Sequence, residues 1–352
     1  MTTAQPRILV VGAGALGLTC AYHLQLAGAQ ISFLVRPHRV PALSRPQTLF
    51  HYNDHSLSTL ENYRVVTDTA ELQGQRFDFV LLTLDGATCR SEQGVATLGA
   101  LGAALADTGT SLVICGVGIG LYEHVQATTG FDPQHLLQGT MKNFAYQVGA
   151  ADAPRPPAAQ AQAHDGADIA YLSFPDHVGF IMASRPGAAA KEFAELYGRS
   201  GVSSCRLIPA TVYAATTSMF SPFILASQIN GWRGTESLLA DRELWQLCCR
   251  SQREILRLKR YGLVGKLLAL LMSDATLEKK MRETDRDASP MGYTAFNRCH
   301  HGGKVLAQNI QILDNCIAAG AEAGQELGAT RSLLQRFTTC AAGSPGKGTL
   351  PV

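Results

Sequence analysis

The chain has 352 residues, of which 46% are hydrophobic and 16% charged, and its formal net charge is +2. This length is enough for two globular domains, each with its own core. The nearly balanced charge predicts no nucleic-acid or membrane-surface partner, and no apolar run is long enough to span a bilayer. The nine cysteines contain no CxxC pair or other metal-binding spacing. We therefore expect a cytoplasmic protein with reduced thiols, no metal site and no signal peptide.

The most informative stretch is Arg7 to Arg36. Ile8 to Val11 is a short apolar run typical of a strand buried on both faces. It leads into Gly12-Ala-Gly-Ala-Leu-Gly17, and the apolar spacing of a helix follows until Gly28. A second apolar run, Ile31 to Val35, completes a strand–helix–strand unit of the length that dinucleotide-binding folds use.

Each glycine of this pattern has a separate physical role. Gly12 allows a tight turn, Gly14 lets the backbone approach a pyrophosphate, and Gly17 lets the helix pack close to the sheet. The helix N-terminus offers free N–H groups to the anion. The predicted contacts of the cofactor are therefore Gly12, Gly14, Ala15, Leu16 and Gly17. The alternative is a glycine-rich turn without a ligand.

The residue that follows the second strand indicates which cofactor is used. An acidic side chain there would accept hydrogen bonds from the ribose hydroxyls of NAD or FAD. The chain instead has Arg36, with Arg39 three residues later and no carboxylate between them. A guanidinium suits a 2′-phosphate, so NADP(H) is the predicted cofactor and a flavin the weaker alternative. Arg36 would otherwise be a solvent-facing arginine at the start of a loop.

The rest of the first half continues with short strands and helices. Prolines 37, 41 and 46 predict an irregular stretch over 37–62. Apolar patterns predict strands at 63–67, 77–84, 111–115, 139–148, 169–174 and 178–184, and helices at 93–106 and 188–200. Asp85 follows a strand, where it would lie near the cofactor or cap a helix. The alanine- and proline-rich residues 150–163 predict an exposed, mobile loop.

From about residue 207 the pattern becomes helical, with apolar spacing over 210–230, 235–261, 263–285 and 303–328. The predicted fold class is thus α/β. A Rossmann-like dinucleotide-binding domain spans 1–205 and an all-α domain for substrate binding and dimerisation spans 206–337. Residues 338–352 are glycine- and proline-rich near their centre and predict a disordered tail.

This layout resembles the ketopantoate reductase family over roughly residues 7–335. Members begin with this kind of glycine turn, have an arginine after the second strand, and end in a helical domain. The resemblance implies an NADPH-binding Rossmann-like domain, reduction of a 2-oxo acid as small-molecule substrate, and frequent dimerisation.

The chain also departs from the family pattern. Where the family has the asparagine of an Asn-Gly-Leu-Gly loop, which touches cofactor and substrate, the matching residue is Val117. Counting back from Ser221-Pro222, the family's catalytic lysine corresponds to Tyr213, and a nearby asparagine corresponds to Thr217. The family's glutamate on the last helix falls on Ile312.

These departures leave the chemistry open. Tyr213 would act as the proton donor, since a phenol is a competent general acid beside a cation or a helix end, or it would be a core aromatic. Thr217, one turn later, would anchor the substrate or bond back to the helix. The first hypothesis is an NADPH-dependent reductase of a ketone, an imine or a 2-oxo acid other than ketopantoate. The second is a fold repurposed for non-redox catalysis or ligand sensing in a biosynthetic pathway.

Overall fold

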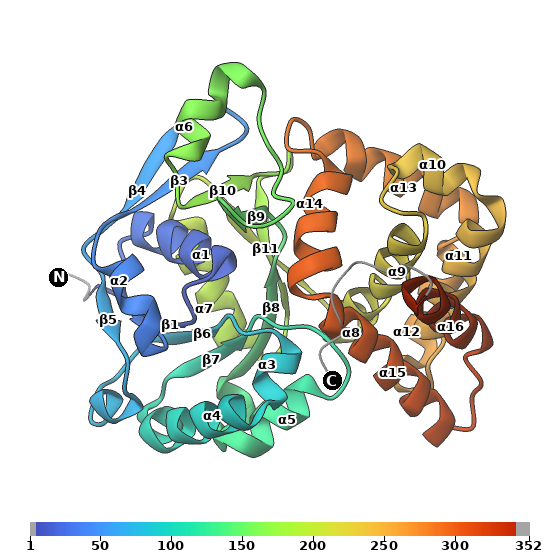
Figure 1. Cartoon of the computed structure of the whole chain (residues 1–352). Coiled ribbons are helices and arrows are strands. Elements are labelled where there is room, and N and C mark those ends of the chain that lie inside the picture. Colours follow the sequence, from blue (N-terminus) through green and yellow to red (C-terminus); the bar gives the residue numbers. More distant parts are fainter. Residues whose placement is uncertain (1–4, 343–352) are drawn as a thin grey trace. The chain divides into compact units, whose positions relative to one another are not determined.

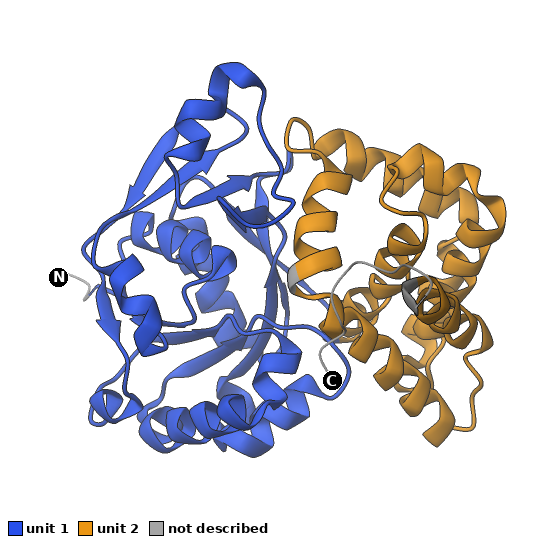
Figure 2. Cartoon of the chain, in the orientation of Figure 1, with its two compact units in different colours: residues 1–210 blue, residues 211–352 orange. Residues whose placement is uncertain are grey.

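The computed structural model describes residues 5–342 and divides into two compact units, residues 1–210 and 211–352 (Figure 2). The domain boundary expected after residue 205 falls inside strand β12 (Ser204–Ile208). This strand pairs in parallel with β11 (Val178–Ala183), so it completes the sheet of the first unit. The second unit therefore begins a few residues later than the expected boundary, whereas its first helix begins at residue 210, as the apolar spacing predicted.

The first unit is built on an eight-stranded sheet with the order β12-β11-β8-β7-β6-β1-β2-β5 (Figure 1). All neighbouring pairs are parallel except β8 and β11, which are antiparallel. The remaining strands are β1 (Arg7–Val11), β2 (Gln30–Leu34), β5 (Arg64–Val66), β6 (Phe79–Leu82), β7 (Ser111–Ile114) and β8 (Leu136–Met141). The predicted α/β class with a Rossmann-like N-terminal region is confirmed.

Both faces of this sheet are buried. Along β1, Ile8 and Val10 pack into one core, whereas Leu9 and Val11 pack into the other. The first core contains residues of α1 (Ala15–Leu26) and α7 (Gly187–Gly198). The second contains residues of α4 (Glu92–Leu105) and α5 (Leu121–Thr129). Helices on both faces explain why the strands are apolar throughout rather than alternating.

A second sheet of four strands, ordered β4-β3-β10-β9, packs on the other side of α1. Its strands are β3 (Gln47–His51), β4 (Leu57–Leu60), β9 (Phe144–Gln147) and β10 (Ile169–Leu172). The prediction of an irregular stretch over 37–62 is wrong for β3 and β4. The prolines lie before β3, where Pro37 and Pro41 begin a 3₁₀ turn (Pro37–Arg39) and the short helix α2 (Val40–Leu43).

Two other predictions for the first unit are corrected. Residues 139–148 are not one strand, because β8 ends at Met141 and β9 begins at Phe144 in the other sheet. The predicted loop 150–163 contains a 3₁₀ turn (Ala158–Gln160) that runs into α6 (Ala161–Asp165). Alanine and glutamine favour helical turns once the prolines have passed.

The second unit is helical throughout its described residues. Its helices are α8 (Ala210–Ser218), α9 (Ser221–Ile229), α10 (Thr235–Ala240), α11 (Arg242–Leu256), α12 (Gly262–Leu271), α13 (Asp274–Asp287), α14 (Tyr293–Cys299), α15 (Leu306–Glu322) and α16 (Gly328–Ala342). The expected long helices are therefore interrupted. Pro222 lies in the first turn of α9, and Asp241 and Ser273 cap α11 and α13 through their side chains.

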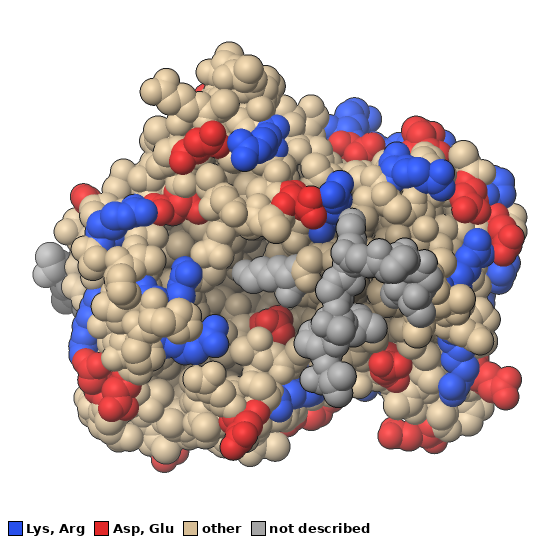
Figure 3. Space-filling view, viewed as in Figure 1, with Lys and Arg blue, Asp and Glu red and all other residues tan. Residues whose placement is uncertain are grey.

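The C-terminal end also differs from the expectation. Helix α16 continues to Ala342, so the first residues of the predicted tail at 338–352 are helical. The remaining residues, 343–352, lie outside the described residues. Within residues 5–342, no helix is long and apolar enough to cross a membrane. On the face shown in Figure 3, Lys and Arg side chains are interspersed with Asp and Glu, as expected for a net charge of +2.

Candidate dinucleotide site

The glycine turn connects β1 to α1 with the geometry that the sequence predicted. Gly12 has a φ of +100°, a value that other residues rarely adopt, and its N–H donates to the Leu34 carbonyl at 3.0 Å. A Cβ on Gly17 would lie 2.3 Å from the Gly12 carbonyl oxygen, so helix and turn meet only because this residue has no side chain. The Thr83 hydroxyl donates to the Val11 carbonyl at 2.8 Å and thereby holds the turn in place.

The N-terminus of α1 is open to an anion. Gly14 is its N-cap residue and supplies no side-chain cap. The N–H groups of Ala15, Leu16 and Gly17 have no acceptor within the helix, because the first turn of any helix leaves its donors unsatisfied. With the positive end of the helix dipole, they form a site of the type that binds phosphate groups.

Two arginines follow β2, and the structure gives them different surroundings. Arg36 is exposed and is the N-cap residue of the 3₁₀ turn at 37–39. Arg39 is half-buried, and its Nη2 donates to the Ala13 carbonyl of the glycine turn at 3.1 Å. Arg39 thus supports the turn, and Arg36 keeps its guanidinium in solvent at the end of the second strand.

Two further loops lie at the same edge of the sheet, because β1, β2, β6 and β7 are mutually parallel. Asp85, after β6, caps α3 (Gly86–Arg90) by accepting from the Thr88 N–H at 2.9 Å and the Thr88 hydroxyl at 2.7 Å. Val117 lies in the loop after β7, and its carbonyl oxygen would be 3.6 Å from a Cβ on Gly86. The predicted cofactor residues are thus gathered at one edge, with Asp85 used as a helix cap.

Sequence reasoning missed Arg90, which joins these two loops. Its Nη1 donates to the Gly86 carbonyl at 3.2 Å and its Nη2 to the Ile119 carbonyl at 3.3 Å. The sequence offered no signal for this contact, because Ile119 lies 29 residues from Arg90. The contact of the Thr83 hydroxyl was missed for the same reason, because its acceptors, the Val11 and Gly12 carbonyls, lie 72 and 71 residues earlier in the chain.

The second unit carries the two predicted catalytic residues on α8. The Tyr213 side chain is only 2% exposed. The Thr217 hydroxyl donates to the Tyr213 carbonyl at 2.9 Å, which is the back-bonding typical of threonine within helices. Ile312, at the position of the family's glutamate, is buried in α15. The roles of Tyr213 and Thr217 therefore stay predictions.

Comparisons with known proteins agree with this geometry. Residues 8–156 match the family model "Ketopantoate reductase PanE/ApbA". No curated protein sequence matches the chain closely enough to count as a relative.

Solved structures match over nearly the whole chain. One is a 2-dehydropantoate 2-reductase from Geobacter metallireducens, with a TM-score of 0.67, 19% identity, and coverage of 95% of this chain and 99% of that chain. Another is a dimeric ketopantoate reductase from Staphylococcus aureus, with a TM-score of 0.63, 15% identity, and coverage of 96% and 99%. A D-mandelate dehydrogenase with NADH and anilino(oxo)acetate has a TM-score of 0.69, 12% identity, and coverage of 96% and 98%.

At these identities the structural matches establish the fold, and the family match supplies the relationship. Both agree with the resemblance inferred from the glycine turn, the arginine and the helical second half. Residues 8–156 thus match the family model of the ketopantoate reductases, and the chain as a whole has the fold of the solved structures. Together they indicate an NAD(P)-dependent oxidoreductase.

Proposed function

We propose that the protein is an NADPH-dependent reductase of a ketone, an imine or a 2-oxo acid other than ketopantoate. The observation that carries the cofactor choice is the exposed guanidinium of Arg36 directly beyond β2. A carboxylate in this place would favour the ribose hydroxyls of NADH, whereas an arginine favours the 2′-phosphate. The uncapped N-terminus of α1 fits the pyrophosphate of either nucleotide.

Within this proposal, the chain's residues bind and orient the cofactor. The N–H groups of Ala15, Leu16 and Gly17 would hold the pyrophosphate, and the Arg36 guanidinium would donate charge-assisted hydrogen bonds to the 2′-phosphate. When bound, the nicotinamide ring supplies a hydride to the substrate's carbonyl or imine carbon. The oxygen or nitrogen of that bond must then take up a proton, and Tyr213 is the proposed donor.

The test is a calorimetric titration of the wild type and an Arg36→Ala variant with NADPH and with NADH. Loss of a charge-assisted contact predicts roughly 10- to 100-fold weaker NADPH binding and unchanged NADH binding. Arg64→Ala is the matched control, because Arg64 is an exposed arginine on β5 that is ion-paired with Glu71. Equal affinities for NADPH and NADH that the Arg36 variant leaves unchanged would rule out the 2′-phosphate role.

A non-redox function is the alternative, and one observation favours it. The buried Tyr213 side chain and the back-bonded Thr217 hydroxyl leave the family's lysine and asparagine positions without an obvious reacting group. A screen of ketones, imines and 2-oxo acids that follows NADPH oxidation separates the two functions. Turnover that Tyr213→Phe lowers would support the reductase, whereas NADPH binding with no turnover of any compound would favour the repurposed fold.

We also propose that the protein is a cytoplasmic homodimer. The similar structure from Staphylococcus aureus is described as dimeric. Helix α12 exposes large apolar side chains, which monomeric proteins rarely leave together in solvent. The nine cysteines are free, as expected in a reducing compartment.

A further inference from the structure

The small sheet of the first unit carries an aspartate, a histidine and a serine that meet at one of its ends. His51 is the last residue of β3, Asp54 lies in the turn that leads to β4, and Ser173 directly follows β10. Strands β3 and β10 are neighbours and parallel (Figure 1), so their C-terminal ends lie at the same edge. None of the three residues belongs to the predicted nucleotide site.

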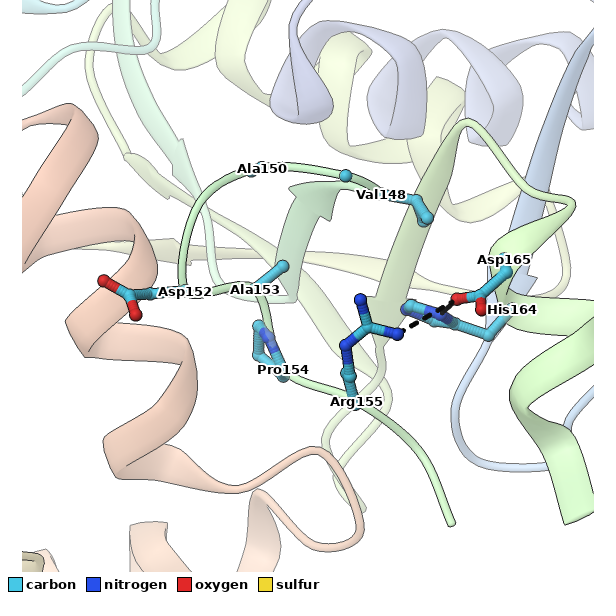
Figure 4. A pocket seen from close by; sticks show the side chains of 9 residues that line it. Val148, Ala150, Asp152, Ala153, Pro154, Arg155, His164 and Asp165 are labelled. Atoms are coloured by element: carbon cyan, nitrogen blue, oxygen red, sulfur yellow. Dashed lines mark hydrogen bonds and ion pairs between the residues drawn. The ribbon is translucent and has the colours of Figure 1, made fainter. Parts of the chain in front are cut away.

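The opposite end of this sheet, where β9 ends and β10 begins, borders a pocket of about 360 Å³ (Figure 4). Residues 148–155 and the C-terminal end of α6 enclose it. Its Arg155 side chain is ion-paired with Asp165 at 3.7 Å, and Asp152 adds a second carboxylate to the lining. The charged groups of the pocket are thus mixed in sign, whereas those at the other end form a connected chain.

Hydrogen bonds connect the three side chains in series. Asp54 Oδ1 lies 3.1 Å from His51 Nδ1, and His51 Nε2 lies 3.3 Å from the Ser173 hydroxyl. A carboxylate only accepts, so Nδ1 carries a ring proton, and in a neutral ring Nε2 is then the acceptor for the serine hydroxyl. The order of carboxylate, imidazole and hydroxyl is the one that activates a serine nucleophile.

The surroundings of His51 keep its ring oriented and neutral. The ring stacks on Tyr171 with centroids 4.5 Å apart and an angle of 17°. Its side chain is 18% exposed, and burial lowers the pKa of His51 despite the Asp54 carboxylate. The other titratable groups that face it are uncharged at pH 7, because burial lowers the pKa of His23 on α1 and raises that of Tyr171. A neutral imidazole is what a general base requires.

Two asparagines position Ser173. Asn53 Nδ2 donates to the Ser173 carbonyl and Asn53 Oδ1 accepts from the Ser173 N–H, both at 2.9 Å. Asn143 is 4% exposed, and its Nδ2 donates to Ser173 Oγ at 3.4 Å. An amide nitrogen has two protons, so Asn143 can also donate to an oxygen on a carbon bonded to Oγ. A side-chain amide is one of the groups that stabilise such an oxyanion.

We propose that Ser173, His51 and Asp54 form a hydrolytic site for small esters. Ser173 is half-buried and Asp54 is exposed, so a short acyl group can reach the serine from solvent. Ser173 Oγ bonds to the ester carbon while its proton passes to His51 Nε2, and this proton joins the leaving alcohol as the carbon–oxygen bond breaks. Water then adds to the acyl carbon, its proton returns through His51 to Ser173 Oγ, and the carboxylic acid is released.

A fluorophosphonate tests the nucleophile directly, because an activated serine displaces the fluoride and retains the phosphonate. Mass spectrometry of the digested protein should place one phosphonate on Ser173. Ser173→Ala should abolish labelling, and His51→Gln should slow it at least about 100-fold. Ser44→Ala is the matched control, because Ser44 is an exposed serine of the same unit whose hydroxyl donates to the Pro41 carbonyl. It should be labelled like the wild type.

Hydrolysis of 4-nitrophenyl acetate tests the roles of His51 and Asp54. The rate should fall on acidification with a midpoint below about pH 6.5, because a protonated imidazole cannot accept the serine proton. Asp54→Asn should lower the maximal rate and move the midpoint to lower pH, because the Asp54 carboxylate raises the pKa of His51. His38→Gln, at an exposed histidine, should leave the rate and the midpoint unchanged.

Circular dichroism of each variant checks that the fold is retained. A wild type without phosphonate on Ser173 would overturn the proposal, as would a folded His51→Gln variant that is labelled as fast as the wild type. Ester hydrolysis that Ser173→Ala leaves unchanged would also contradict it, and an unchanged midpoint in Asp54→Asn would remove Asp54 from the site. None of these readouts depends on nucleotide binding or on the reduction of a substrate.

Discussion

His23 is a fully buried histidine on α1, at 1% exposure, and its Nδ1 lies 2.7 Å from the Tyr197 hydroxyl. Burial lowers the pKa of His23 to about 4, with a smaller contribution from His51. In the unfolded chain the pKa returns to about 6.5. Between these values the unfolded state takes up a proton that the folded state does not, so stability must fall as the pH falls from about 6.5 to 4.

The prediction is that His23→Gln reduces this pH dependence. Glutamine can still bond to Tyr197 but takes up no proton, so about 2 kcal/mol of the destabilisation between pH 7.5 and pH 5 should disappear. Urea unfolding at about pH 7.5 and pH 5 measures it. Part of the slope should remain, because burial also lowers the pKa of His301. His38→Gln, at an exposed position, should leave the slope unchanged. An unaltered slope in His23→Gln would contradict the assignment.

The cysteines show what residue type alone can predict. The sequence indicated reduced thiols used in packing, and seven of the nine are buried, with Cys205 intermediate and Cys340 exposed. Burial raises the pKa of Cys89 and Cys316 to about 12, which makes them poor nucleophiles. The partner of His23 could not be predicted in this way, because Tyr197 lies 174 residues further along the chain.

Helices α4 and α5 pack closely because of one glycine. A Cβ on Gly102 of α4 would lie 1.9 Å from the Thr129 carbonyl oxygen at the end of α5. Gly99, one turn earlier on the same helix, has nothing within 4 Å of its Cβ position. The two glycines therefore have opposite consequences when they are changed to alanine.

Gly102→Ala should lower the free energy of unfolding by roughly 1–3 kcal/mol, because the backbone of α5 must move away. Gly99→Ala should raise it by up to about 1 kcal/mol, because alanine is the better helix former. Urea denaturation of both variants beside the wild type measures the difference. If both substitutions stabilised the protein, the contact between α4 and α5 would be less close than described.

The elements that sequence predicted well are those whose signals are local. The unit β1–α1–β2 needs only an apolar run, a glycine turn and a helical period, and its ends agree within a residue or two. Strand β3 was missed because the prolines before it conceal its apolar core residues and because only one of its two partners, β4, is local. The other partner, β10, lies more than a hundred residues later. The breaks between helices of the second unit were missed because each depends on one residue, such as Pro222 in the first turn of α9 or the N-cap residues Asp241 and Ser273 of α11 and α13.

At the scale of the molecule, the first unit contains the predicted nucleotide contacts and the second contains Tyr213, Thr217 and the most exposed apolar surface. On α12, Leu263, Leu267, Leu270 and Leu271 are 81%, 58%, 74% and 58% exposed. Their spacing places them along one side of the helix. A symmetric dimer brings the same surface of two copies together, so one such face on each copy is sufficient to form an interface.

The corresponding prediction concerns the oligomeric state. Light scattering after size exclusion should give the mass of two chains for the wild type. A Leu267→Glu/Leu270→Glu variant should give the mass of one chain, because burying carboxylates in an apolar interface without partners is costly. The substituted side chains are exposed within one copy, so the variant should keep the helical content and cooperative unfolding of the wild type.

Leu57→Glu separates loss of the interface from a general effect of added charge. Leu57 is 51% exposed on β4 in the first unit, so its replacement should leave the dimer intact. A wild type with the mass of one chain at all concentrations would contradict dimerisation, and a dimeric double variant would place the interface elsewhere. If the α12 variant is monomeric and still binds NADPH like the wild type, the nucleotide site is complete within one copy, as the location of all its predicted contacts in the first unit requires.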